Sequence, residues 1–333
     1  MRFGMFVPQG WRYDLVGIAP AEQWQVMHGV AAAADRDGSP WESIWVYDHF
    51  HTTPVPSPTE ATHEAWSLVN AFAASTSRVR IGQMCTCMGY RNPAYLAKVA
   101  ATADLISGGR VEMGIGGGWY EHEWRAYGYG FPDVPDRLKM LREGVEIMHQ
   151  AWTTGSATLD GEYYRVDGAI VQPQPLQPGG IPIWIAGGGE KVTLRIAAKY
   201  ASYTNFYGGI EEFARKSEIL RGHTDRLGRD FDSITRSANF NTIIGTDAAD
   251  VERRLAAVEA RVAPYLGPDG TARYLAAFRS EAGALVGTPQ QIVDRLSAAR
   301  DAGLGYAIHY FPEAAYDRSG IELFEREVIP ALG

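Results

Sequence analysis

Short apolar runs of strand length alternate with longer helical patterns along almost the whole chain of 333 residues. Eight of these runs are rich in Val, Ile and aromatic residues, which favour strands. Eight strands that each lead into a helix predict an α/β fold, a single (β/α)8 TIM barrel over residues 1–333. The predicted strands are 2–8, 43–50, 78–87, 111–115, 183–186, 203–207, 234–244 and 306–311.

One stretch, residues 156–182, interrupts this alternation. It holds two short β-type runs, at 163–166 and 170–172, followed by closely spaced prolines, so we expect an insertion before the fifth strand. A doubly wound open sheet is the alternative to a barrel. Its nucleotide-binding form needs a G-x-G-x-x-G turn after the first strand, where this chain has Pro8-Gln9-Gly10-Trp11.

Charge and cysteine content narrow the functional classes. A formal net charge of -8 argues against a basic surface for nucleic acid, and no apolar stretch is long enough to cross a bilayer. The apolar N-terminal run stops at Pro8 and is too short for a secretion signal. Cys85 and Cys87 are the only cysteines, which disfavours a structural zinc site, and no metal is expected. We therefore expect a cytoplasmic protein that acts on a small molecule.

Two predicted strands end in three consecutive glycines, at 116–118 and at 187–189. Without Cβ atoms, such a backbone can approach a flat or anionic ligand closely. The second run precedes a predicted helix, whose free N–H groups favour a phosphate. The side chains of Trp119 and Tyr120, directly after the first run, are large enough to form a pocket wall. Two exits of this kind in one chain predict one ligand that is held from two sides.

The second strand ends in Tyr47-Asp48-His49, at the barrel end where working residues gather. His49 can donate or accept a proton near neutral pH, or it can be a polar rim residue beside a loop-capping Asp48. The segment around Met84 and Cys85 can back a planar ring or fill the core.

Two further histidines carry less specific signals. Glu121-His122-Glu123 lacks the spacing of a metal motif and is interpreted as a polar rim. His309, near the end of the last strand, can enter the pocket or be a satisfied barrel residue.

Taken in order, several short segments resemble the bacterial luciferase-like superfamily of flavin- and deazaflavin-dependent oxidoreductases. They are 2–8, Ser43-Ile-Trp-Val-Tyr-Asp-His-Phe50, Arg78-Val-Arg-Ile-Gly82 with Tyr90-Arg-Asn-Pro93, Gly108-Gly-Arg-Val111 leading to 114–118, 182–189, and Gly287-Thr-Pro289 with Gly303. The Asp-His-Phe ending of the second strand resembles the branch that uses coenzyme F420, a 5-deazaflavin. This resemblance covers nearly the whole chain.

The resemblance implies roles for individual residues. Asp48 would contact the cofactor, and His49 would lie beside the reacting ring as the proton donor. The backbone at Met84–Cys85 would form a bulge with a non-prolyl cis peptide behind the ring. The further cofactor residues that it implies are Gly117, Gly118 and His122 along the cofactor, and Gly187, Gly188, Gly189, Lys191 and Val192 at its phosphate end.

The substrate pocket is expected to include Trp11, Trp119, Tyr120 and His309. Trp119 stands where the glucose-6-phosphate dehydrogenases of this branch carry a glutamate base. A sugar phosphate is therefore not implied as the substrate, and an aromatic wall favours a larger or more apolar molecule.

Three functions are open at this point. The first is F420-dependent hydride transfer between the deazaflavin C5 and an organic substrate, with His49 handling the proton. The second is an FMN-dependent monooxygenase that uses reduced flavin and oxygen. The third is a non-catalytic flavin-binding relative, against which Asp48, His49 and His122 argue. The resemblance also implies a homodimer, formed through helices near the second and third strands.

Overall fold

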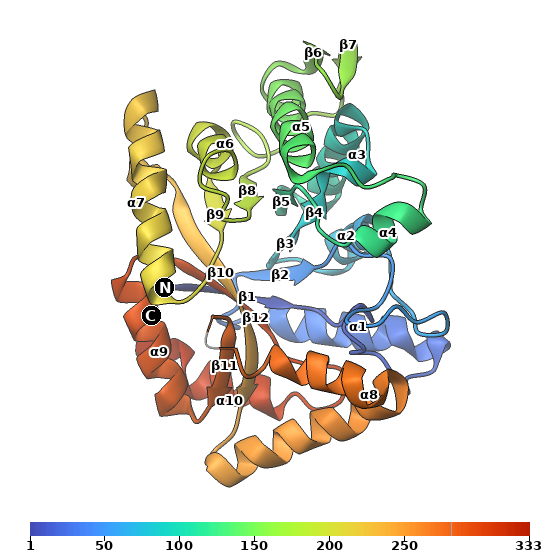
Figure 1. Ribbon diagram of the computed structural model, residues 1–333, viewed down its shortest axis with the longest axis vertical. Coiled ribbons are helices and arrows are strands. Elements are labelled where there is room, and N and C mark those ends of the chain that lie inside the picture. The colour runs from blue at the N-terminus through green and yellow to red at the C-terminus, as the bar shows by residue number, and fades with distance from the viewer. Residues whose placement is uncertain (281) are drawn as a thin grey trace.

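The computed structural model describes residues 1–280 and 282–333. Within this part, eight parallel strands close into a barrel in the order β1-β2-β3-β5-β8-β9-β10-β12, and β12 pairs with β1 (Figure 1). The predicted (β/α)8 barrel is therefore confirmed. These strands are β1 (Arg2–Phe6), β2 (Ser43–Val46), β3 (Arg80–Gln83), β5 (Val111–Gly116), β8 (Ile183–Ala186), β9 (Tyr203–Asn205), β10 (Thr235–Ile244) and β12 (Tyr306–Tyr310).

Helices surround the barrel (Figure 1). Local sequence explains where several of them begin and end: Glu64 caps α2 by accepting hydrogen bonds from two backbone N–H groups, and Asn92 caps α3 just before Pro93. The helices are α1 (Pro20–Asp35), α2 (Ala65–Ser75), α3 (Pro93–Ser107), α4 (Glu121–Ala126), α5 (Val134–Thr154), α6 (Thr193–Tyr200), α7 (Ile210–Leu227), α8 (Ala248–Ala276), α9 (Pro289–Asp301), α10 (Ser319–Glu327) and α11 (Ile329–Leu332), with short 3-10 turns η1 (Met88–Tyr90) and η2 (Phe231–Ser233).

Two strands differ from the prediction made from the sequence pattern. The predicted strand 78–87 is broken at Met84–Cys85, where the non-prolyl cis peptide that the resemblance implies is confirmed, and its second part forms β4 (Thr86–Cys87) against β5. A further strand, β11 (Ala284–Gly287), pairs with the C-terminal half of β10. Its four residues are too few for periodicity to identify. Helix α8 has a kink at Gly267, whose backbone dihedral angles are not helical.

Aromatic side chains fill the inside of the barrel. Trp45 on β2 contacts Trp184 on β8, with ring centroids 4.7 Å apart, although these strands are not neighbours in the sheet. Tyr306 on β12 lies 5.0 Å from the same indole, and Tyr203 stacks on it at 3.8 Å. Contacts across non-adjacent strands require these rings to lie inside the barrel. The interior is therefore a packed floor, and a ligand can enter only above it.

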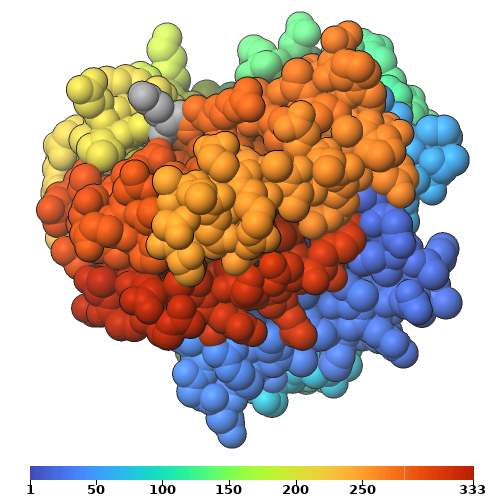
Figure 2. All heavy atoms as spheres, turned by 90° about the horizontal axis from the view of Figure 1, so that it is seen from below, coloured from blue at the N-terminus to red at the C-terminus, as the bar shows by residue number. Residues whose placement is uncertain are grey.

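The chain ends meet on the outside of the barrel. The N-terminal amino group donates a hydrogen bond to the carbonyl of Leu332 at 3.1 Å, and the C-terminal helices lie against the N-terminal segment (Figure 2). Residues 156–170 form the antiparallel hairpin β6 (Ser156–Asp160) and β7 (Arg165–Ile170), which lies beside the end of α5 (Figure 1). In the described part of the chain, none of the helices combines the length and apolar character that a bilayer crossing requires.

Candidate active site

A cavity of about 420 Å³ opens where the barrel strands end. Its wall comes from the exits of β1, β2, β3, β5 and β8, from β10, and from the first turns of α5 and α6. The lining residues are Trp11, Tyr47, Asp48, His49, Met84, Cys85, Cys87, Tyr90, Gly116, Gly117, Gly118, Trp119, Tyr120, Val134, Arg137, Leu138, Ala186, Gly187, Thr193 and Asn239. Most of the predicted site residues are thus brought together.

His49 lies in this wall between aromatic rings. Trp11 stacks on the imidazole with ring centroids 4.0 Å apart and planes only 4° from parallel. The rings of Trp119 and Tyr120 approach it edge-on at 5.7 and 5.8 Å. The indole Nε1 of Trp11 is buried and has no hydrogen-bond partner within the described part of the chain. His49 therefore has a defined plane, and the wall beside it offers an unpaired N–H donor.

Glu123 is the partner of His49. Its Oε2 lies 2.9 Å from His49 Nδ1, and its Oε1 accepts hydrogen bonds from the backbone N–H groups of Phe50 and His51. Burial would raise the pKa of Glu123, but the hydrogen bonds from His49 and the backbone outweigh it, so this pKa lies below its ordinary value. The sequence interpretation of 121–123 as a polar rim missed this role, because the partners are more than 70 positions apart.

Asp48 is hydrogen-bonded to other residues of the protein and so stabilises the cavity wall. Its two carboxylate oxygens accept hydrogen bonds from the Arg91 guanidinium at 2.6 and 2.8 Å, and one also accepts from the Cys87 N–H at 2.8 Å. Arg91 reaches on to Glu64 at 2.8 Å. Both oxygens are therefore occupied within the protein. Asp48 holds the segment that follows the Met84–Cys85 peptide, and Arg91 was not singled out from the sequence.

In the first glycine exit, Gly116 and Gly118 pack closely against two cysteine side chains of the neighbouring segment. A Cβ on Gly116 would lie 2.9 Å from Cys85 Sγ, and one on Gly118 would lie 2.4 Å from Cys87 Sγ. These glycines let the end of β5 pass the segment around Cys85, in addition to shaping the cavity. Burial raises the pKa of the Cys85 thiol to about 12, so this thiol stays protonated and is a poor nucleophile.

The second glycine exit lies beside the first, because β8 pairs with β5. Gly187 lines it, while α6 begins only at Thr193, after a turn, and not directly from the glycines as expected. A Cβ on Gly188 would lie 2.6 Å from Lys216 Nζ. This cation, on α7, was missed by the sequence interpretation. The side chains of Lys191 and Val192 are exposed, and the described lining includes neither of them, nor Gly188 and Gly189.

Two predicted histidines lie elsewhere. His122 is exposed and outside the described lining, with its Nδ1 2.9 Å from that of His51. The expectation that it lines the cofactor cavity is therefore corrected, because α4 directs Glu123 inward and leaves His122 outside. His309 is fully buried and pairs with Thr242 at 2.9 Å between aromatic rings that include Phe324.

The assignment of His309 to the substrate pocket is wrong for a simple reason. Neighbouring residues of a strand face opposite sides, and His309 faces the helices and not the barrel mouth. Burial lowers its pKa to about 3, because the apolar surroundings disfavour the imidazolium. It is a neutral core residue.

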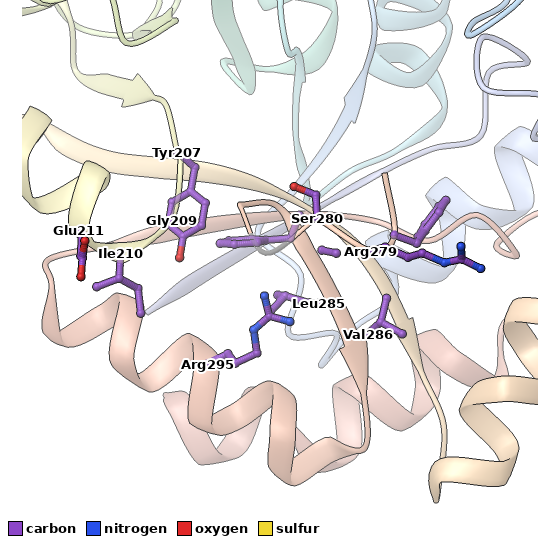
Figure 3. A pocket seen from close by; sticks show the side chains of 12 residues that line it. Tyr207, Gly209, Ile210, Glu211, Arg279, Ser280, Leu285, Val286 and Arg295 are labelled. Carbon is purple, nitrogen blue, oxygen red and sulfur yellow. The ribbon is translucent and has the colours of Figure 1, made fainter. Parts of the chain in front are cut away.

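A cavity of about 530 Å³ lies outside the barrel, beside α7, α9 and β11 (Figure 3). Phe240 lines it and packs on His309, whereas Asn239, the preceding residue of β10, lines the barrel-mouth cavity. The two cavities are therefore on opposite faces of this strand. The outer cavity contains none of the residues that the sequence predicts for the site.

Comparisons with known proteins agree with the barrel fold. The family model described as luciferase-like monooxygenase matches residues 1–305. A curated relative, the F420-dependent glucose-6-phosphate dehydrogenase of Amycolatopsis mediterranei, is 28% identical over 94% of this chain and 97% of its own. The structure of the coenzyme F420-dependent tetrahydromethanopterin reductase from Methanopyrus kandleri superposes with a TM-score of 0.77 at 21% identity, covering 100% of this chain and 99% of that one.

A monooxygenase from Streptomyces bottropensis superposes equally well, with a TM-score of 0.79 at 19% identity over 100% of both chains. At these identities the two structural likenesses concern the fold.

Proposed function

We propose that this chain, which belongs to the luciferase-like monooxygenase family, is an oxidoreductase that uses coenzyme F420 to transfer hydride to or from a small organic molecule. The observation that carries the proposal is the position of His49, fixed between Trp11 and Glu123 in the wall of the barrel-mouth cavity. The relative named for F420 matches over nearly the full length of both chains.

The cavity residues fit an elongated cofactor with a planar head and an anionic tail. For the head, Trp11 Nε1 is a buried donor without a partner among the described residues, and the Met84–Cys85 segment forms a wall that would back the ring. For the tail, Gly187 and Thr193 line the cavity near the start of α6, and Lys216 lies beside Gly188. Backbone N–H groups and an ammonium group would suit a phosphate there.

When bound, a deazaflavin of this kind supplies a carbon centre that gives or takes hydride. The protein would supply position and proton handling. His49 would hold the exchanged proton on the imidazole nitrogen that faces the cavity. Asp48 would act indirectly, by fixing the Cys87 backbone and Arg91. The surrounding aromatic rings would exclude water from the reacting atoms.

We propose an apolar or aromatic substrate. Trp119 is 59% exposed and lines the cavity beside His49, together with Trp11 and Tyr120. Among the described lining residues, Arg137 is the one Lys or Arg side chain, and it packs on the Phe131 ring at 4.1 Å. A sugar phosphate would need more cationic and polar partners than this wall offers. We therefore do not propose glucose 6-phosphate, which gives the curated relative its name, as the substrate of this chain.

The alternative is an FMN-dependent monooxygenase, to which the family name, luciferase-like monooxygenase, points. Fluorescence titrations with F420 and with FMN, run side by side on the purified protein, separate the two. We expect F420 to bind at least about tenfold more tightly. Reduced F420 should then be oxidised by a suitable unsaturated substrate without oxygen. Tighter binding of FMN, or turnover that requires oxygen, would contradict the proposal.

We further propose that the protein is a cytoplasmic homodimer. The apolar side chains of Tyr95, Leu105 and Ile106 on α3 are 63%, 47% and 46% exposed, which gives α3 a surface that a second copy could cover. Two free thiols suit a reducing compartment. Sedimentation of the wild type and of Ile106→Asp tests the interface, and a monomeric wild type would contradict it.

A further inference from the structure

The carboxylate of Glu123 is completely buried, and each of its two oxygens has two hydrogen-bond partners. Oε1 accepts from the N–H groups of Phe50 at 2.7 Å and His51 at 2.8 Å. Oε2 faces His49 Nδ1 at 2.9 Å and accepts from the hydroxyl of Tyr90 at 3.0 Å. A buried carboxylate with four donors stays ionised, in line with its lowered pKa. An ionised carboxylate can only accept, so the hydrogen in the contact with His49 belongs to Nδ1.

The contact with Glu123 determines which ring nitrogen of His49 can exchange a proton with a ligand in the cavity. With Nδ1–H committed to Glu123, a neutral imidazole presents Nε2 as its lone-pair atom. Within the described part of the chain, Nε2 makes no hydrogen bond, and the residue lines the cavity. Trp11 stacked on the ring face prevents the ring from rotating away. The tautomer and the plane are therefore both fixed before any ligand arrives.

Among the described groups around His49, Glu123 is the one placed to fix the tautomer of the imidazole. Asp48, the adjacent acid, has both oxygens engaged by Arg91 and the Cys87 N–H. His51 and His122 pair with each other outside the described cavity lining. Trp119 and Tyr120 meet His49 through their ring edges. Of the described acidic side chains, Glu123 is the one in hydrogen-bond contact with this imidazole.

We propose that Glu123 is the positioning residue of the proton-handling histidine: it fixes His49 as the Nδ1–H tautomer and stabilises the imidazolium that forms when Nε2 takes a proton. This inference rests on the proposed function, because it concerns the proton that accompanies hydride transfer. When a substrate is reduced, the hydride supplies two electrons and one hydrogen. The Nε2–H bond of His49 breaks, its proton bonds to the substrate, and the ring returns to neutral with Nδ1–H still on Glu123.

The first test needs neither cofactor nor substrate. Long-range 1H–15N spectra of histidine-labelled protein distinguish the two neutral tautomers, and His49→Asn identifies the His49 signals. We expect the Nδ1–H form in the wild type and a mixture or the other tautomer in Glu123→Gln. A wild-type His49 with its hydrogen on Nε2 when neutral would overturn the inference, whatever the cofactor proves to be.

The second test uses turnover of reduced F420 with a substrate found by screening. In Glu123→Gln, kcat should fall at least about tenfold, while the dissociation constant for F420 changes by less than about threefold. The histidine limb of the pH–rate profile should move to lower pH, because the imidazolium loses its anionic partner. Glu121→Gln is the matched control: it makes the same change on α4 at an exposed carboxylate that pairs with Arg125 and lies outside the described cavity lining, so rate and profile should be retained.

Two outcomes of this second test would contradict the inference. An unchanged kcat and pH limb in Glu123→Gln would show that the carboxylate does not act on the proton step. A lower kcat in Glu123→Gln with an unchanged pH limb, an unchanged His49 tautomer and a lower melting temperature would assign Glu123 to packing alone. If the wild type binds no F420, the proposed function fails, and the tautomer measurement still decides whether Glu123 sets the state of His49.

Discussion

His49 Nδ1 lies 2.9 Å from Glu123 Oε2, although 74 positions separate the two residues in the chain. The contact joins the exit of β2 to α4, which follows the exit of β5. Because Glu123 also receives the N–H groups of the two residues after His49, the same carboxylate shapes the loop and orients the imidazole. This relationship turns a histidine at a strand end into a group with one defined tautomer.

The first prediction concerns His49 itself. His49→Ala should lower kcat by roughly 10²-fold or more, because general acid–base catalysis is typically worth about 10²–10⁴-fold. The dissociation constant for F420 should change by less than about tenfold, since backbone groups would carry most of the binding. Steady-state kinetics and fluorescence titration give the two numbers. Weak cofactor binding with intact turnover would make His49 a ring-positioning residue, and wild-type values for both would leave it a rim residue.

The second prediction concerns the phosphate end. Gly188→Val should weaken F420 binding by at least about tenfold, because its Cβ would meet Lys216 Nζ and its branches would block access to the backbone. Gly222→Val, on the same helix as Lys216, is the control, since a Cβ there meets no atom within 4 Å. Isothermal titration of both variants compares them. An unchanged affinity in Gly188→Val would show that the phosphate is bound elsewhere.

The third prediction concerns the substrate wall. Trp119→Ala should raise KM for an apolar substrate by about tenfold, because an aromatic contact worth about 1–1.5 kcal/mol is lost. Binding of F420 should change little. Tyr127→Ala removes an aromatic side chain that is 54% exposed and outside the described cavity lining, and it should leave KM unchanged. Equal KM values for Trp119→Ala and the wild type would remove Trp119 from the substrate site.

The fourth prediction concerns the pH dependence of stability at His309. Burial lowers the pKa of this side chain to about 3 in the folded protein, whereas an unfolded histidine titrates near 6.5. Between these values the unfolded state binds the extra proton. The stability contribution is therefore complete above about pH 6.5 and is lost as pH falls towards 3, by up to about 1.4 kcal/mol per pH unit.

Urea unfolding between pH 7 and 4.5 tests this prediction. His309→Phe should flatten the slope of stability against pH. Phe240→Leu, a change in the same ring cluster without a titratable group, should lower stability and keep the slope. Parallel slopes for the wild type and His309→Phe would show that His309 is not protonated on unfolding in this range.

The barrel itself could be predicted from the chain because strand and helix periodicities are local properties. Runs such as Ser43–Val46 and Ile183–Ala186 carry β-branched and aromatic residues, and the helices between them carry their own caps at Glu64 and Asn92. Where local pattern was short, prediction failed: β11 has four residues. The break of the third strand at Met84–Cys85 was expected only through the family resemblance.

Sequence alone also determined where the site residues gather, because parallel strands bring their C-terminal ends to one face, and His49 and both glycine exits lie at such ends. Only the tertiary structure decided their partners. Glu123 faces His49 and His122 does not face the cavity, because the orientation of α4 is set by packing of Trp124 and not by local pattern. Lys216 reaches Gly188 from another helix, and His309 faces outward by the register of β12. Contacts between distant segments depend on how the elements pack, and spacing along one segment does not encode them.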